Sequence, residues 1–156
     1  MAVHFAIARL GALDLDRAAA LHAESFVPLG ERGWTRQDLA GLVASPGVAG
    51  LLLQADGQDA GFALCRVAAE EAELLTIAVR PPWRRRGGGR RLLAAIVDHA
   101  RAAGALSLFL EVGVDNPAAR SLYEAQGFTA VGRRRDYYLR GGAPAVDGVV
   151  MRLTLN

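Results

Sequence analysis

The sequence predicts a single-domain α/β protein in which a mixed sheet of about seven strands is flanked by about four helices. Its length of 156 residues suits one domain with one hydrophobic core. Short apolar segments of strand type alternate with segments whose apolar residues recur at helical spacing. Three strands in the first half follow one another as in a meander, whereas the later strands alternate with helices, and this order favours a mixed sheet.

The N-terminal half is expected to form strands, two helices and a loop. The strands are expected at 5–10, 48–54, 59–67 and 73–79, the helices at 13–26 and 35–43, and a loop rich in Pro and Gly at 27–33. Asp14 is a suitable N-cap for the first helix, and Thr35 followed by Asp38 has the spacing of a capping box at the second. Asp56-Gly57 is typical of a tight β-hairpin turn.

The C-terminal half is expected to add helices and strands in alternation. The helices are expected at 90–103 and 116–126, and the strands at 106–112, from 128 through 131 onward, and at 146–155. Apolar residues at 92, 93, 96, 97 and 100 give the first of these helices one buried face, and Gly104 ends it. Asn116-Pro117 starts the second helix, because Asn suits the N-cap and Pro suits the first turn. Gly127 ends that helix.

Composition predicts a folded, cytoplasmic protein that is neither secreted nor bound to a membrane. Apolar residues make up 52% of the chain, and no run of about 18 uninterrupted apolar residues is present. The N-terminus lacks the charged segment and apolar stretch of a secretory signal. The formal net charge is only +2, which does not indicate a general nucleic-acid-binding protein.

Cysteine and histidine give no indication of disulfide or metal chemistry. The single cysteine, Cys65, falls in an expected strand, where a buried apolar role is expected. His4, His22 and His99 are scattered without metal-ligand spacing, so no metal site is expected. All 18 basic residues are arginine, which fits either biased codon usage or an amine-modifying enzyme that benefits from having no amino side chains of its own.

Residues 81–93 carry the most informative pattern, Pro-Pro-Trp-Arg-Arg-Arg-Gly-Gly-Gly-Arg-Arg-Leu-Leu, between an expected strand and an expected helix. Glycines at a helix start allow a ligand to approach the backbone closely, and the first amides of the helix have no helical acceptor. These amides, the positive helix end and the flanking arginines form a seat for an anion. The pattern therefore predicts a ligand that carries phosphates.

Three classes of phosphate ligand fit such a seat, and the surrounding residues argue against two of them. A P-loop requires Gly-Lys followed by Ser or Thr, whereas this chain has Gly-Arg-Arg at 89–91. A dinucleotide fold requires a third glycine where Leu92 stands and a parallel strand order before the motif. The third class is coenzyme A, whose pyrophosphate would bind the amides of residues 85–90 and whose pantetheine arm would follow the preceding strand.

Two segments resemble a known family. Arg84-x-x-Gly87-x-Gly89 resembles the Q/R-x-x-G-x-G/A signature of the GNAT superfamily of acetyltransferases, and the apolar segments on both sides match its context. Residues 110–128, Leu-Glu-Val-Gly-Val-Asp-Asn-Pro-Ala-Ala-Arg-Ser-Leu-Tyr-Glu-Ala-Gln-Gly-Phe, resemble the bacterial ribosomal-protein-alanine N-acetyltransferases, as do Gly-Arg-Arg at 132–134 and the following Tyr-Tyr pair. The resemblance covers residues 22–155.

The resemblance implies a GNAT-type fold, acetyl-CoA as co-substrate with no metal, and an acetylated N-terminal α-amine as product. The expected acceptor is the N-terminal alanine of a small-subunit ribosomal protein. The implied acetyl-CoA-binding residues are Ile77, Ala78, Val79, Arg84, Arg85, Arg86, Gly87, Gly88, Gly89, Arg90 and Asn116. Ile77 and Val79 would contribute main-chain groups to the pantetheine arm. A monomer or weak dimer is expected, with no nucleic-acid partner and no membrane partner.

Glu111 is the candidate general base. It lies near the end of an apolar strand, where burial would raise its pKa and make it a stronger base, and the family's catalytic glutamate falls on this position. A salt bridge to a neighbouring arginine such as Arg120 is the structural alternative. Glu73, at the start of the strand before the glycines, is a second candidate base, although Glu70 and Glu71 beside it suggest a solvated turn.

Tyr123 is the candidate general acid, and a core aromatic residue is the structural alternative. It shares one helix face with Asn116 and Ala119, and the family's general acid protonates the departing thiolate. Asn116 is first a helix cap, and in the family its side chain also contacts pantetheine. Direct attack by the amine is expected, because no activating histidine is evident for Cys65. A strand N–H near Val79 would stabilise the oxyanion.

The chain departs from the family on the acceptor side. Many relatives have an arginine where Gly113 stands and a serine where Asp115 stands, so this chain loses a cation and gains a carboxylate beside the base. The loop 27–33 is also longer than in those relatives. Tyr137 and Tyr138 would line the acceptor-peptide groove or, alternatively, form part of an edge strand.

Three other functions compete with N-terminal protein acetylation. They are small-molecule amine acetylation, a non-catalytic regulatory role that binds CoA, and nucleic-acid recognition through residues 84–91. The Leu-Glu-Val and Tyr-Tyr segments count against the first. The low net charge and the lack of interleaved aromatic residues beyond Trp83 count against the third.

Overall fold

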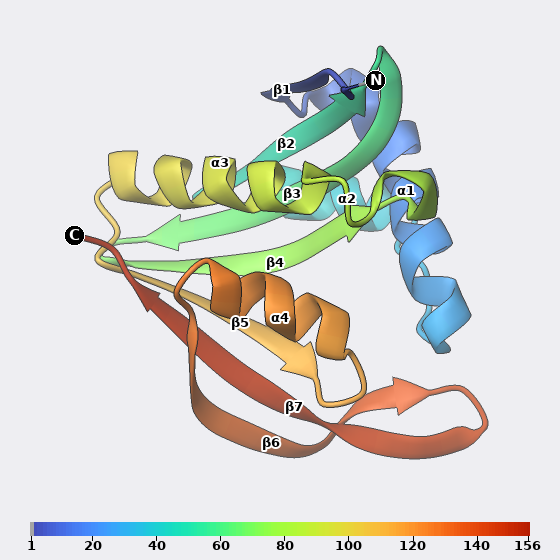
Figure 1. Cartoon of the computed structure of the whole chain (residues 1–156), viewed down its shortest axis with the longest axis vertical. Coiled ribbons are helices and arrows are strands. Elements are labelled where there is room, and N and C mark those ends of the chain that lie inside the picture. Colours follow the sequence, from blue (N-terminus) through green and yellow to red (C-terminus); the bar gives the residue numbers. More distant parts are fainter. Residues whose placement is uncertain (1) are drawn as a thin grey trace.

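The computed structural model describes residues 2–156, which form a seven-stranded mixed sheet with helices on both faces (Figure 1). The strands are β1 (Phe5–Arg9), β2 (Val48–Ala55), β3 (Gln58–Ala68), β4 (Glu71–Val79), β5 (Ser107–Gly113), β6 (Thr129–Arg140) and β7 (Ala143–Thr154). The α-helices are α1 (Leu15–Phe26), α2 (Arg36–Ala44), α3 (Gly88–Ala102) and α4 (Pro117–Ala125), and the 3₁₀ turns are η1 (Ala12–Asp14), η2 (Val27–Leu29) and η3 (Pro81–Trp83). The predicted fold class is confirmed.

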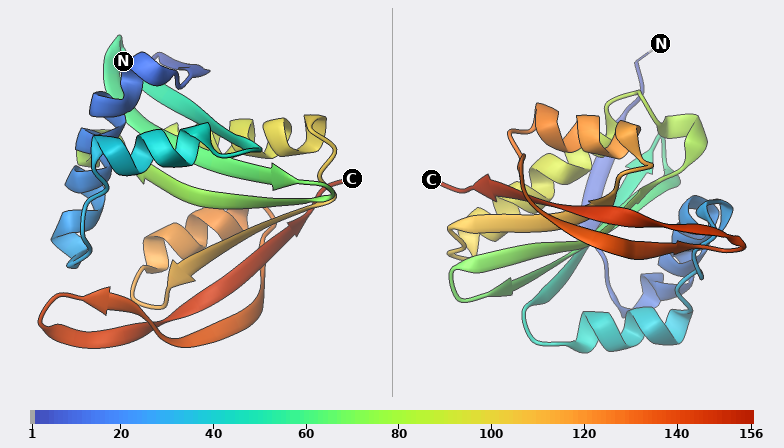
Figure 2. Two further views of the ribbon diagram at one scale, coloured as in Figure 1. Left: turned by 180° about the vertical axis from the view of Figure 1, so that it is seen from behind. Right: turned by 90° about the horizontal axis from the view of Figure 1, so that it is seen from below.

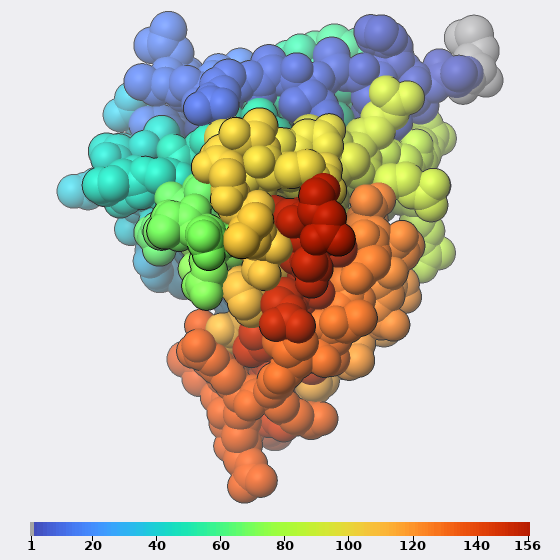
Figure 3. Space-filling view, turned by 90° about the vertical axis from the view of Figure 1, so that its left-hand side faces the viewer, coloured from blue at the N-terminus to red at the C-terminus, as the bar shows by residue number. Residues whose placement is uncertain are grey.

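Strand order explains why the sheet is mixed. Neighbouring strands follow the order β1-β2-β3-β4-β5-β7-β6, and each adjacent pair is antiparallel except β4 and β5. These two strands run parallel because α3 carries the chain back between them. The β6–β7 hairpin extends beyond the other strands (Figure 1) and forms the narrow lower end of the molecule in the space-filling view (Figure 3).

Two apolar cores lie on opposite faces of the sheet. α3 and α4 cover one face, whereas α1 and α2 cover the other (Figure 2). Leu92 and Ile96 of α3 are fully buried in the first core, and Leu39 of α2 packs with Phe62 of β3 in the second. Each such side chain contributes about 1.5–3 kcal/mol when it is removed from water. The helical spacing of apolar residues in α3 therefore predicted its buried face correctly.

A β-bulge in β4 precedes the opening in the sheet. Where the pairing passes from Leu64 to Cys65 of β3, it skips Leu75 of β4. β4 then pairs with β5 only over its first residues, Glu71 to Glu73, and the two strands diverge beyond that point (Figure 1). The main-chain groups of β4 on this side have no partner strand after the divergence, so a ligand that enters the gap can pair with them.

Several local signals in the sequence are confirmed by hydrogen bonds. The Thr35 hydroxyl accepts from the Asp38 amide at 3.1 Å while the Asp38 carboxylate accepts from the Thr35 amide at 2.9 Å, which is a capping box. Asn116 Oδ1 accepts from the Ala119 amide at 3.2 Å and caps α4. The Asp-Gly turn between β2 and β3 has positive φ angles at both residues, as its composition predicted.

Other local expectations hold only in part. Asp14 occupies the N-cap position of α1, but its side chain makes no capping hydrogen bond, because its carboxylate accepts from the Gly11 amide and from the Arg17 guanidinium instead. α3 begins at Gly88, two residues before the expected start, so two of the three glycines belong to its first turn. β7 begins at Ala143, three residues before the expected start. No end for β6 could be predicted from the sequence, because the strand is exposed along most of its length and shows no alternation of apolar residues.

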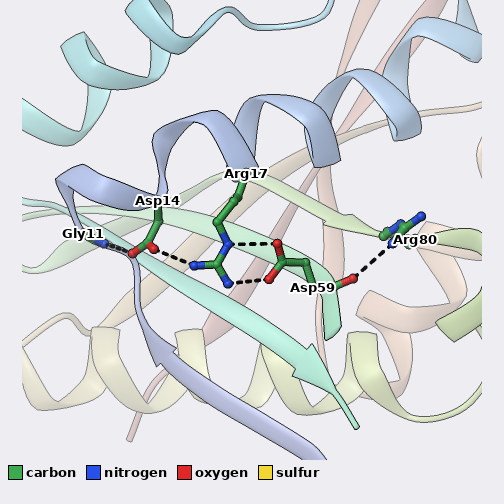
Figure 4. A network of polar contacts seen from close by, with 5 residues as sticks. All are labelled: Gly11, Asp14, Arg17, Asp59 and Arg80. Carbon is green, nitrogen blue, oxygen red and sulfur yellow. Dashed lines mark hydrogen bonds and ion pairs between the residues drawn. The ribbon is translucent and has the colours of Figure 1, made fainter. Parts of the chain in front are cut away.

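A polar network connects α1 to the end of β4. Arg17 lies between Asp14 and Asp59 and donates to both carboxylates (Figure 4). Arg80, directly after β4, donates to the Asp59 carbonyl at 3.5 Å and to Glu24 of α1 at 3.0 Å. These contacts hold the end of β4 in a fixed position relative to the helix layer. Within residues 2–156, no helix has both the length and the apolar character to cross a membrane.

Candidate active site

A cleft of about 1030 Å³ opens where β4 and β5 diverge. Its walls come from β4, the turn at 84–90, the end of β5, α4, the segment after α1 and the end of β6. The sequence-predicted residues that line it are Glu73, Ile77, Ala78, Val79, Arg84, Arg85, Gly87, Gly89, Arg90, Glu111, Asn116, Tyr123, Tyr137 and Tyr138. Arg86 and Gly88 do not line it. The fold thus brings the two candidate catalytic residues together with most candidate acetyl-CoA-binding residues.

The start of α3 has the geometry of an anion seat. Gly87 has φ +91°, a conformation that L side chains rarely adopt, and no atom lies within 4 Å of where its Cβ would be. The first amide to donate within the helix is that of Arg91, to the Gly87 carbonyl at 3.0 Å. The amides of residues 88–90 therefore have no helical acceptor and lie at the positive end of the helix. This arrangement fits the pyrophosphate of coenzyme A.

The arginines around this seat differ in what they contact. Arg84 Nε donates to the Val79 carbonyl at 2.8 Å and so fastens the turn to the end of β4. The Arg86 guanidinium lies 5.7 Å from the centre of the Trp83 ring. Arg85 and Arg90 line the cleft, and neither forms an ion pair within residues 2–156. These two side chains are therefore the best placed for phosphate.

The Cα of Gly88 packs against the sheet and does not line the cleft, although its amide is part of the anion seat. It is buried, and a Cβ there would lie 3.1 Å from Leu53 Cδ2 and 3.2 Å from Phe5 Cε1. A methyl group at this position would force the Leu53 and Phe5 side chains, or α3 itself, to shift by a few tenths of an ångström. Gly89 has only ordinary contact distances, the nearest being 3.4 Å to Leu122 Cδ2, and it faces the cleft.

The two carboxylate oxygens of Glu111 have different surroundings. Oε1 lies 3.2 Å from Arg134 Nε on the neighbouring hairpin, whereas Oε2 is buried and has no hydrogen-bond partner among residues 2–156. Burial raises the pKa of Glu111, the Arg134 charge opposes that rise, and the nearby Glu73 carboxylate adds to it. The salt bridge considered for Glu111 exists, but its partner is Arg134. Arg120 pairs instead with Glu124 of its own helix at 3.1 Å.

Tyr123 reaches the cleft from the apolar core. It is 5% exposed, and its ring meets Phe128 edge-on at a centroid distance of 5.9 Å. Burial raises the pKa of its phenol, so the hydroxyl stays protonated and available as a proton donor. Asn116 and Ala119 line the same cleft, as expected from their shared helix face. The side-chain oxygen of Asn116, Oδ1, caps α4. The side-chain NH₂ group of Asn116 therefore stays available for a ligand.

The other titratable candidates have weaker positions. Glu73 lines the cleft near Glu111 but is exposed, and no atom of it is buried without a partner. Cys65 is fully buried in β3 and is not part of the cleft wall. Burial raises the pKa of its thiol to about 11, so it is protonated near neutral pH. A covalent route through Cys65 is therefore disfavoured by its position and by its protonation state.

The sequence did not identify several residues at the other end of the cleft. Arg140 of β6 pairs with Glu31 after α1 and with Asp115 after β5. Its guanidinium fills the space above Gly113, where a Cβ would lie 2.8 Å from Arg140 Nη2 and 2.6 Å from Asp115 Oδ1. Arg140 and Glu31 are 109 positions apart, so no local pattern could indicate their contact.

Known proteins of one family resemble this chain in sequence. The model of the acetyltransferase (GNAT) family matches residues 15–128. The [ribosomal protein bS18]-alanine N-acetyltransferase of Salmonella typhimurium is 41% identical over 106 residues, which span 68% of this chain and 71% of that protein. The N-alpha-acetyltransferase RimI of Mycobacterium tuberculosis is 39% identical over 143 residues, 87% of either protein.

Structural similarity extends over nearly the whole chain. The crystal structure of the ribosomal-protein-S18-alanine N-acetyltransferase from Escherichia coli has a TM-score of 0.87 and 31% identity, covering 98% of this chain and 95% of that one. The sequence and the structure thus both match those of known acetyltransferases. The chain belongs to the GNAT family and is an N-acetyltransferase that uses acetyl-CoA.

Proposed function

We propose that this enzyme acetylates the N-terminal α-amine of a protein, and that the acceptor is the alanine at the start of a small-subunit ribosomal protein. The names of the relatives from Salmonella typhimurium and Escherichia coli support this acceptor. The observation that carries the proposal is the buried Glu111 Oε2 without a partner in a cleft whose other end is an anion seat. An unsatisfied buried carboxylate oxygen is costly, and its use as a proton acceptor explains its presence.

Charge along the cleft suits the two substrates. Arg84, Arg85 and Arg90 line one end, where the phosphates of the donor are expected. Glu73 and Glu111 line the part toward β5 and β6, which favours a positively charged ammonium group over an anionic acceptor. The direction of this charge separation supports an amine as the acceptor.

Acetyl-CoA supplies the acetyl group as a thioester that an amine can attack. Residues 77–79 of β4 offer main-chain groups to the pantetheine arm, and the amide N–H groups of Asn116 offer a second contact. An α-amine has a pKa near 8, so part of it is neutral at physiological pH. Glu111 Oε2 accepts the remaining proton, and the Tyr123 hydroxyl donates a proton to the departing sulfur. A main-chain N–H near Val79 stabilises the charge on the carbonyl oxygen.

Parallel acceptor assays test the proposal. The full chain is incubated with acetyl-CoA and a short peptide that begins with alanine, and product is measured by mass spectrometry. The matched control is the same peptide with a blocked N-terminus, and a panel of polyamines and aminoglycosides forms the second arm. We expect one acetyl group on the free peptide only. Turnover of small amines without turnover of the peptide would refute the proposed acceptor.

A further inference from the structure

Arg140 joins three chain segments around the acceptor end of the cleft. Its side chain is only 8% exposed. Nη1 lies 2.7 Å from Glu31 Oε2 in the segment between η2 and α2. Nε and Nη2 donate to the two Asp115 oxygens at 2.8 and 3.0 Å, in the turn between β5 and α4. A guanidinium that binds one carboxylate with two parallel hydrogen bonds and a second carboxylate besides fixes all three segments.

Backbone contact strengthens this junction independently of charge. Gly30, beside Glu31, has φ +81° and lies against the start of the β6–β7 turn. A Cβ at Gly30 would lie 2.6 Å from the Arg140 carbonyl carbon and 2.8 Å from the Gly141 nitrogen. The segment after α1 and the hairpin therefore touch closely, and a side chain at Gly30 would separate them.

The same guanidinium is connected to the base through Tyr138. It lies 4.9 Å from the centre of the Tyr138 ring, a distance typical of a cation–π contact. The Tyr138 ring and Glu111 Oε2 both border Gly148, whose Cβ would lie 3.3 Å from Tyr138 Cε2 and 3.5 Å from Oε2. Arg140 thus holds the aromatic wall that stands beside the buried carboxylate oxygen.

We propose that Arg140 is a positioning residue that shapes the acceptor end of the cleft by joining Glu31, Asp115 and Tyr138, and that acetyl-CoA binding does not depend on it. This inference rests on the proposed function, since it assigns the Arg140 junction to the acceptor. None of these contacts involves residues 84–90, which form the anion seat. Without the guanidinium, two carboxylates would face each other across the junction and repel.

The experiment measures both substrates for variants of the full chain. Arg140→Gln removes the charge, Arg140→Lys keeps it but loses the two-pronged contact, and Gly30→Ala separates the segments while all charges remain. Arg135→Gln is the matched control, because Arg135 lies on the same strand, is exposed and forms no ion pair within residues 2–156. Steady-state kinetics give the KM for the alanine peptide, and calorimetry gives the Kd for acetyl-CoA.

We expect the peptide KM to rise about tenfold or more in Arg140→Gln and in Gly30→Ala, and to rise less in Arg140→Lys. In all three variants, kcat and the Kd for acetyl-CoA should change by no more than about threefold. The control should match the unmodified chain. An unchanged peptide KM, or an equal loss of acetyl-CoA affinity, would overturn the inference. If the alanine peptide is not a substrate, amide hydrogen exchange of residues 27–34 tests the Arg140 junction separately from the proposed acceptor. Faster exchange in Arg140→Gln than in the unmodified chain would support the junction, and unchanged exchange would overturn it.

Discussion

At the scale of single residues, the proposed chemistry depends on Glu111, a carboxyl group with one paired oxygen and one oxygen without a partner among residues 2–156. Arg134 is itself largely exposed, so its charge offsets the burial of Glu111 only in part, and the pKa of Glu111 stays raised. A raised pKa makes the carboxylate a stronger base while it is still ionised near neutral pH. Burial also raises the pKa of the Tyr123 phenol and keeps it protonated, which fits its proposed role as the proton donor.

Replacement of Glu111 separates catalysis from stability. Glu111→Gln is expected to lower kcat by about 10²–10⁴-fold, because the proton acceptor is lost. The free energy of unfolding should stay equal or rise, since burying the ionised group is unfavourable. In the unmodified enzyme, kcat/KM should fall as the pH drops through the raised pKa of Glu111. The matched variant is Glu73→Gln; a larger loss of kcat there than in Glu111→Gln would make Glu73 the base.

His22 gives the stability a specific pH dependence. It is buried between Phe26 and Trp34, and its Nδ1 accepts from the Trp34 amide at 3.0 Å. Burial first, and the Arg32 charge second, lower its pKa from 6.5 to about 4. The unfolded chain takes up this proton near the ordinary pKa and the folded chain only near the lowered one. Stability from this group is therefore complete above pH 6.5 and is lost as the pH falls toward 4.

His22→Phe removes this titration while keeping an aromatic ring in the stack. Between neutral pH and about pH 5, the unmodified chain should lose about 1–2 kcal/mol more unfolding free energy than the variant. Urea unfolding at both pH values measures the difference. Equal pH dependence in the two proteins would show that His22 is not the group responsible.

At the scale of elements, glycines at the start of α3 have separate tasks, which the sequence pattern did not distinguish. The run of three glycines predicted an anion seat. In the structure, Gly87 and Gly89 line the cleft, whereas Gly88 packs against the sheet on the other side of the helix start. Helix caps and the hairpin turn could be predicted because they depend on residues only a few positions apart. The length of β6 could not, since its exposed residues carry no alternating pattern.

Gly88 and Gly41 should respond in opposite ways to the same substitution. Gly88→Ala places a methyl group against Leu53 and Phe5 and is expected to cost about 1–3 kcal/mol of unfolding free energy. Gly41→Ala lies in α2 with no atom within 4 Å of the new carbon, and it should gain about 0.5–1 kcal/mol from the higher helix propensity of alanine. Thermal and urea unfolding give both values. A neutral Gly88→Ala would contradict the tight packing of α3.

At the scale of the whole molecule, a net charge of +2 conceals a separation of charge within one cleft. Arg84, Arg85 and Arg90 line the donor end, whereas the acceptor end is lined by three glutamates, Glu31, Glu73 and Glu111, and one arginine, Arg140. Sequence reasoning could propose the donor end as one group, because its residues are consecutive in the chain. It proposed Glu111 and Tyr123 through the family resemblance. The Arg134–Glu111 and Arg140–Glu31 pairs form only through the tertiary fold and have no signature in the chain.

Two arginines near the donor end, Arg86 and Arg90, are expected to differ in their effect on acetyl-CoA affinity. Arg90→Gln should weaken acetyl-CoA binding about tenfold, the value of one charge-assisted hydrogen bond, and more salt should reduce the difference. Arg86→Gln is the matched control, because Arg86 stacks on Trp83 and does not line the cleft. Calorimetric titration at two ionic strengths provides the comparison. Equal losses in both variants would mean that the arginines act only as a general positive field.

The most direct test of the account is a crystal structure of this chain with coenzyme A joined covalently to the N-terminus of an alanine peptide. We expect the pyrophosphate on the amides of residues 88–90, the pantetheine arm along residues 77–79, and the former amine beside Glu111 Oε2. A pyrophosphate bound elsewhere, or a peptide whose first nitrogen lies away from Glu111, would contradict it.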